Sequence, residues 1–149
     1  MKKIIIYLFT LSILSLSCAP KLYDTNVQNS ILNKKEKKFI EKFEYTVQHH
    51  QEKKFMKYLD KKYKKEQFYD LYKANLKSFL ADFFCGTGKD KKFYCLNFFD
   101  IESIKVYKIE PYEQNQKKII FKITGKDKTF YTDLILNNQK RLGFIGSYG

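Results

Sequence analysis

The chain has 149 residues, with 29 basic and 16 acidic side chains and a formal net charge of +13. Its 14 phenylalanines and 12 tyrosines exclude a disordered chain, and its length suffices for one domain with a real core. Arg141 is the single arginine, so the positive charge is almost all lysine, the poorer residue for bidentate recognition of bases and phosphates.

The first 17 residues have the three-part layout of a secretory signal. Lys2 and Lys3 form a positive start, an apolar run of 11 residues covers positions 4–14, and small residues follow up to Ser17. A run of this length is too short to span a bilayer, which requires roughly 20 apolar residues. The pattern predicts an exported chain from which residues 1–17 are removed as a signal peptide.

The segment that ends at Cys18 resembles the lipobox of bacterial lipoproteins, in which the cysteine is lipidated and the leader is cut before it. Ser17 has the usual small size, whereas Ser15 stands where leucine is usual and Leu16 where a small residue is usual. The resemblance implies that residues 18–32 form a lipidated cysteine and a tether, with the lipid as a stable membrane anchor. An ordinary secreted chain and a retained anchor helix are the alternatives.

This leader places the chain in the bacterial cell envelope, and its sequence after the cysteine suggests that it faces the periplasm. By resemblance to known sorting rules, Ala19 and the absence of an acidic run after it give no sign of surface export. The location removes nucleic acid as a partner, although a charge of +11 remains once Lys2 and Lys3 are lost. Two explanations of that charge stay open. One is a solvated basic surface, and the other is attraction to anionic lipid headgroups or an acidic partner.

Three helices are predicted in the first half of the mature chain. The first is capped by Ser30 or Asn33 and is marked by apolar residues at helical spacing, namely Leu32, Phe39, Ile40, Phe43 and Val47. A short second helix is predicted over residues 52–61, with Phe55, Met56 and Leu59 facing inward. The third is predicted over residues 66–84, with an apolar stripe made by Tyr69, Tyr72, Leu76, Phe79, Leu80 and Phe83.

Strand and turn signals replace the helical period after these helices. Residues 85–90 read as a turn-rich break, and alternating segments predict strands over 93–99, 102–112, 118–124, 129–136 and 139–147. Turns are expected at 125–127 and at Asn137–Asn138, the latter as a tight hairpin with positive φ. Helices followed by an antiparallel meander predict one α+β domain over residues 33–149, with the helices on one face of the sheet.

The layout resembles the nuclear-transport-factor-like, or cystatin-like, superfamily. The matching stretches are the short helix at 53–59, the strand opening at 100–106 and the chain end at 142–148, and the resemblance covers about 33–148. It implies a curled antiparallel sheet of four or five strands that wraps a long helix and leaves a cone-shaped pocket. Some members are isomerases or dehydratases with an Asp and a His in the pocket, and others only bind ligands or partners. Such a fold does not determine a function.

The cysteines predict a disulfide and no metal site. If Cys18 carries lipid, Cys85 and Cys95 remain as a pair, and an exported chain favours a bond between them that stabilises by roughly 3 kcal/mol. Two free buried thiols are the alternative. Two cysteines at this spacing without a nearby histidine are not a zinc pattern, so we expect no metal and no other cofactor.

No catalytic residue is predicted. His49 and His50 are adjacent, so on a helix they point about 100° apart, and we expect both to be exposed near a helix end. Asp133 lies on an alternating strand between Tyr131 and Ile135 and could face a pocket, although an acid that is solvent-facing or paired with lysine is the favoured explanation. The candidate pocket residues are Tyr72, Phe79, Phe83, Phe121, Tyr131 and Asp133.

The sequence therefore predicts a lipoprotein tethered to a membrane through Cys18 that acts as a non-catalytic binding module. Its expected ligand is a small apolar molecule, a peptide or a protein partner. The alternatives are an immunity-type or inhibitor lipoprotein that uses a basic face, a cell-envelope enzyme with an acid in the pocket, and a purely structural envelope protein.

Overall fold

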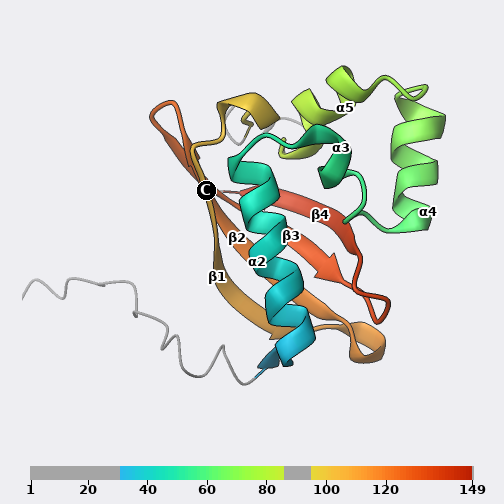
Figure 1. Ribbon diagram of the computed structural model, residues 1–149, viewed down its shortest axis with the longest axis vertical. Helices are drawn as coiled ribbons and strands as arrows, with labels where there is room; N and C mark the ends of the chain where they lie inside the picture. Colours follow the sequence, from blue (N-terminus) through green and yellow to red (C-terminus); the bar gives the residue numbers. More distant parts are fainter. Residues whose placement is uncertain (1–30, 86–94, 149) are drawn as a thin grey trace, which may run out of the picture.

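The structure is a computed structural model that describes residues 31–85 and 95–148 (Figure 1). In chain order it contains α2 (Lys34–Gln48), α3 (Glu52–Phe55), α4 (Lys61–Tyr63), the π-helix η1 (Lys64–Leu71), α5 (Leu76–Phe83), the short 3₁₀ helix η3 (Phe98–Asp100), β1 (Ser103–Pro111), the 3₁₀ turn η4 (Glu113–Asn115), β2 (Lys117–Gly125), β3 (Lys128–Leu136) and β4 (Leu142–Tyr148). The predicted signal peptide, Cys18, Ser30 and the break at 86–90 lie outside the described residues.

The α+β prediction is confirmed, because N-terminal helices pack against a four-stranded antiparallel sheet in the order β1-β2-β3-β4 (Figure 1). The sheet is not strongly curled, so the curled sheet implied by the resemblance is not observed. The strand predicted at 93–99 is wrong over its described part. Asn97 caps η3 by accepting a hydrogen bond from the N–H of Phe99, and that turn replaces an extended chain.

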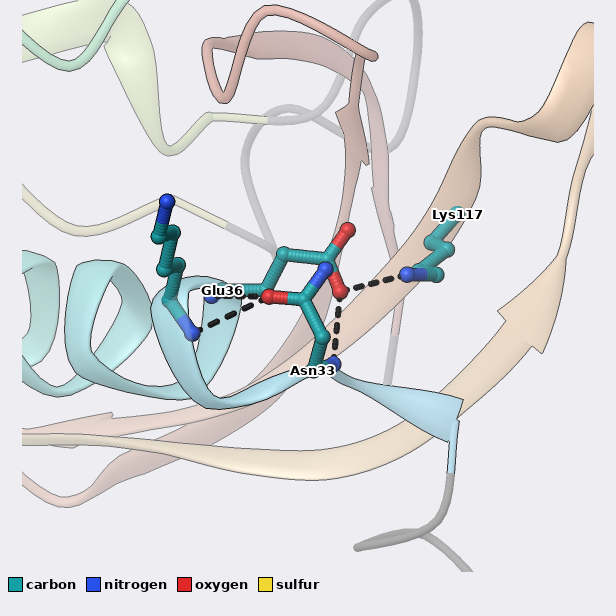
Figure 2. Close-up of polar contacts among 4 residues, drawn as sticks. Asn33, Glu36 and Lys117 are labelled. Atoms are coloured by element: carbon teal, nitrogen blue, oxygen red, sulfur yellow. Dashed lines mark hydrogen bonds and ion pairs between the residues drawn. The ribbon is translucent and has the colours of Figure 1, made fainter.

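Helix α2 begins with a capping box that also bonds it to the sheet. The side-chain oxygen of Asn33 accepts hydrogen bonds from the N–H groups of Lys35 and Glu36, and the Glu36 carboxylate accepts one from the N–H of Asn33 at 2.8 Å. The same carboxylate oxygen accepts a hydrogen bond from the ammonium group of Lys117, at the start of β2 (Figure 2). The two atoms are 2.5 Å apart. Asn33, one of the two predicted caps, thus determines where the helix starts.

The second predicted helix is shorter than expected, because part of it joins the sheet. Helix α3 ends at Phe55, and Leu59 forms an isolated parallel bridge with Leu142 of β4. The N–H of Asp60 donates to the carbonyl of Leu142, and the N–H of Leu142 donates to the carbonyl of Tyr58, both at 2.8 Å. The inward orientation predicted for Phe55 and Leu59 is confirmed, since both are completely buried.

The third predicted helix is wrong as a single element, because the chain breaks between η1 and α5. Lys73 and Ala74 have positive φ angles of 49° and 58°, and the Asn75 side chain then caps α5 by accepting from the N–H of Ser78. Tyr69, predicted on the inward stripe, lies on η1 with 56% of its surface exposed.

The two hairpin turns differ from each other. Lys126 and Asp127 both have positive φ and form the two-residue turn between β2 and β3 at the predicted place. The tight hairpin predicted at Asn137–Asn138 is wrong, because the strands separate at Leu136 and Leu142 and the positive φ falls at Lys140. The Asn137 side chain instead accepts from two later N–H groups and closes a longer loop.

The core lies between the helices and one face of the sheet. Aromatic rings dominate it, and the largest fully buried side chains include Phe43, Phe55, Phe79, Phe84, Phe98, Phe121 and Phe130. Aliphatic side chains that alternate along β2 and β3 complete it, among them Ile119, Ile123, Leu134 and Leu136.

The two edges of the sheet are built differently. At the β1 edge, the Glu44 carboxylate of α2 accepts a hydrogen bond from the N–H of Val106 at 2.8 Å, directly before a bulge, and Pro111 ends the strand. Burial raises the pKa of Glu44, although this bond and Lys105 act against the rise. Strand β4 carries no charged side chain. Among the described residues, the backbone pairing along its outer edge is limited to the bridge between Leu142 and Leu59.

Candidate functional site

The structure divides the six predicted pocket residues between two faces of the sheet. Phe79, Phe83 and Phe121 are at most 3% exposed and belong to the core. The ring of Phe121 lies 5.5 Å from that of Phe43 on α2, so it points toward the helices. Phe79, Phe83 and Phe121 therefore lie in the core between the helices and the sheet.

Tyr72 lies at the margin of this core. Its ring packs 5.7 Å from that of Phe79, and its hydroxyl donates a hydrogen bond to the carboxylate of Asp82 at 2.9 Å. Burial, followed by this hydrogen bond, raises the pKa of Tyr72 to about 12. The contact fastens the end of η1 to α5 and gives Tyr72 a structural role.

Tyr131 and Asp133 point away from the helices. Phe121 pairs with Thr132 in the β2–β3 register, and paired residues of an antiparallel sheet share a face. Thr132 is fully buried toward the core, so its neighbours Tyr131 and Asp133 project from the opposite face. An acid paired with lysine, one of the explanations favoured for Asp133, fits this position, because the Asp133 carboxylate lies 3.7 Å from the Lys118 ammonium group.

Three tyrosines gather on this outer face, and we call Tyr107, Tyr131 and Tyr148 the tyrosine face. The ring centroids of Tyr107 and Tyr131 are 4.7 Å apart, and the rings of Tyr131 and Tyr148 stack at 5.9 Å. Tyr107 is the extra residue of the β1 bulge, and a second register shift, between Asp133 and Leu134, lies in the β3–β4 pairing. Tyr148 stays 43% exposed.

A chain of ion pairs lies beside the tyrosine face. Lys108 and Lys118 contact the Glu110 carboxylate at 2.5 and 2.6 Å, and Lys118 also approaches Asp133. The hydrogen bonds from Lys108 and Lys118 hold the pKa of Glu110 below its usual value, and the bond to Glu110 raises the pKa of Lys118. Burial raises the pKa of Asp133, whereas the Tyr148 hydroxyl and Lys118 act in the opposite direction.

Asp133→Asn is expected to stabilise the protein by about 1 kcal/mol at pH 7 and by less at pH 3. Oδ1 of Asp133 is buried without a hydrogen-bond partner among the described residues, and burial raises the pKa of the carboxyl. A raised pKa in the folded state favours folding at low pH, and this contribution is lost as the pH rises through that pKa. Urea unfolding at both pH values measures the difference.

Asp70→Asn is the matched control, because Asp70 is exposed on η1. We expect its effect to stay within about 0.5 kcal/mol at both pH values. A loss of stability in Asp133→Asn at pH 7 would contradict the prediction and show that the ion pair with Lys118 outweighs burial.

The histidines do not form a common site. His49 is exposed, and its Nδ1 lies 2.8 Å from the carbonyl of Tyr45, whereas Nε2 of His50 lies 3.0 Å from the carbonyl of Ile101. His50 is partly buried, which corrects the expectation that both are exposed. Within residues 31–85 and 95–148, no three His, Cys, Asp or Glu side chains are placed to hold a metal ion.

Cys85 and Cys95 are joined by the disulfide that the sequence predicts. Cys85 directly follows α5, and Cys95 precedes η3, so the bond connects the helical layer to the segment that leads into β1. None of the helices in the described part is long and apolar enough to cross a membrane.

The described surface also has open grooves lined mainly by polar side chains. One of about 510 Å³ lies between α2 and α3, and its lining residues are Glu41, Lys42, Tyr45, Thr46, Gln51, Lys54 and Tyr58. Another of about 480 Å³ runs beside the start of β4, and its lining includes Asp60, Tyr63, Glu66, Ile135 and Phe144. Neither groove contains any of the six predicted pocket residues.

Comparison of the chain with models of protein families, with curated proteins and with solved structures finds no match.

Proposed function

We propose that the protein is a lipoprotein of the bacterial cell envelope, anchored to a membrane through Cys18, that binds a protein partner without catalysis. The observation that carries this proposal is the tyrosine face, which three strands assemble on the side of the sheet that the helices leave uncovered. The leader and the lipobox-like segment support the anchor.

The outer face has the composition of a docking surface. Tyrosine is enriched at protein interfaces because it offers a large apolar ring together with a hydroxyl group that can donate or accept a hydrogen bond. Tyr148 is 43% exposed, and the ion pairs around Glu110 provide a polar border. A protein partner is favoured over a small apolar ligand, since Phe79, Phe83 and Phe121 occupy the interior.

Fatty-acid labelling tests the anchor. Cells fed an alkyne fatty acid are expected to label the chain and to retain it in the membrane fraction, and Cys18→Ser should lose both properties. An unlabelled chain that fractionates with the cytosol would contradict the anchor and the compartment together.

Tyr148→Ala tests the tyrosine face in the anchored protein. After crosslinking in cells and purification from membranes, we expect the crosslinked partner to fall at least about fivefold, the effect of losing about 1 kcal/mol at an interface aromatic. Tyr69→Ala is the matched control, because Tyr69 is an exposed tyrosine on η1 and should leave recovery unchanged. Equal recovery with both variants would contradict a role for the outer face.

A further inference from the structure

The lysines of the described surface differ in their ion pairs. On the strands, Lys105, Lys108, Lys117 and Lys118 contact carboxylates, whereas Lys122 and Lys128 are exposed on the β2–β3 hairpin. On α2, α3 and the turn that follows, seven exposed lysines have no ion-pair partner within the described ranges, and we call these residues the basic helical face: Lys34, Lys35, Lys38, Lys42, Lys53, Lys54 and Lys57.

The groove between α2 and α3 opens within the basic helical face. Lys42 and Lys54 belong to its lining, one from each helix. Thr46 is buried, and its hydroxyl donates to the hydroxyl oxygen of Tyr58 at 3.4 Å, which leaves the Tyr58 proton for another acceptor. Tyr45, also in the lining, is 54% exposed and stacks on His49. The groove thus combines two ammonium groups and a hydroxyl donor with one carboxylate, that of Glu41, so its lining keeps a net positive charge for an anionic headgroup.

We propose that the basic helical face binds anionic phospholipid, with a headgroup phosphate held between Lys42 and Lys54. This inference deepens the proposed function, because it rests on the lipid anchor to bring the face to a bilayer. The described chain begins at Ile31, directly before α2, and a tether of about 12 residues reaches on the order of 20 Å. The anchor therefore brings α2 close to the membrane, where lysine and exposed tyrosine are both favoured.

This orientation is consistent with the placement of the tyrosine face. The helices cover one face of the sheet (Figure 1). The tyrosine face lies on the other, so a membrane-bound helical layer leaves Tyr131 and Tyr148 directed toward the aqueous compartment. An acidic protein is the other class of partner that a basic surface attracts. Lipid is favoured, because α2 is the first described helix after the expected tether, and an anchor there raises the effective concentration of headgroups near it.

Vesicle sedimentation tests the inference with the full chain carrying Cys18→Ser, so that acylation does not contribute. Vesicles of phosphatidylcholine are compared with vesicles that contain about 30% phosphatidylglycerol. Lys42→Gln/Lys54→Gln is expected to lower partitioning onto the anionic vesicles by about 20-fold, since each lysine near such a surface changes it several-fold. Lys122→Gln/Lys128→Gln removes the same charge from exposed lysines of the β2–β3 hairpin and should change partitioning less than about twofold.

The outcomes separate this inference from the proposed function. Equal losses in the two double variants, or no loss in either, would overturn the inference, even if Cys18 is acylated in cells. A selective loss in Lys42→Gln/Lys54→Gln would support it even if Cys18 carries no lipid. Far-ultraviolet circular dichroism of each variant should match that of the parent chain, because neither pair of lysines is buried.

Discussion

Phe55→Ala is expected to lower the free energy of unfolding by about 4 kcal/mol. Phe55 is fully buried, and its ring centroid lies 5.8 Å from that of Phe43, 4.8 Å from that of Phe83 and 5.1 Å from that of Phe98. These partners come from α2, α5 and η3, so one side chain connects the three parts of the helical layer. Its removal leaves a cavity that no single element can close by shifting.

Urea unfolding followed by circular dichroism measures this loss at pH 7. Leu71→Ala is the control, because Leu71 is a large apolar residue on η1 with 65% of its surface exposed, and we expect a change within about 0.5 kcal/mol. A loss of less than about 1 kcal/mol for Phe55→Ala would contradict the central position of this ring.

Gly125→Ala is expected to destabilise the protein by about 3 kcal/mol. A Cβ atom at position 125 would stand 2.1 Å from the carbonyl oxygen of Asp100 and 3.2 Å from the backbone nitrogen of Glu102. Both contacts are with backbone, which cannot rotate away as a side chain does, so the end of β2 must separate from the segment that enters β1.

Gly146→Ala is the matched control for Gly125→Ala. It makes the same chemical change in β4, where an added Cβ meets no atom within 4 Å, so thermal and urea unfolding should show a change within about 1 kcal/mol. Similar losses for the two variants would show that backbone entropy, and not the contact with Asp100, controls the effect.

The regular elements with strong local signals could be predicted from the sequence. Helix α2 follows from apolar residues at helical spacing and from Asn33 with Glu36 three residues later, which form the observed capping box. The alternation in 118–124 and 129–136 likewise predicts β2 and β3 to within one residue at each end. In these segments the local pattern and the tertiary packing favour the same structure.

The segments that failed depend on distant contacts. The break between η1 and α5 falls at Lys73 and Ala74, residues that favour a helix, and nothing local marks their positive φ. The shortened second helix likewise depends on Leu59 pairing with Leu142, far along the chain. Neither feature can be read from the residues near it in the sequence.

The candidate site was predictable only in part for a related reason. Alternation shows that Tyr131 and Asp133 share a face, but only the register with β2 shows that this face is opposite to Phe121. Tyr107 joins them because the β1 bulge adds a residue, and Tyr148 joins them across the β3–β4 pairing. Both tyrosines lie outside the predicted pocket residues, because neither a bulge nor a pairing partner has a local signature in the sequence.

The contrast between the two sheet edges limits how copies of this chain could aggregate. Where Glu44 occupies the N–H of Val106, an incoming strand would have to displace a charged side chain, whereas β4 presents no charge to exclude one. Two copies joined through β4 would leave a β1 strand at each outer end. If strands add only at the β4 edge, repeated strand addition stops at a pair of copies, which does not grow into a fibril.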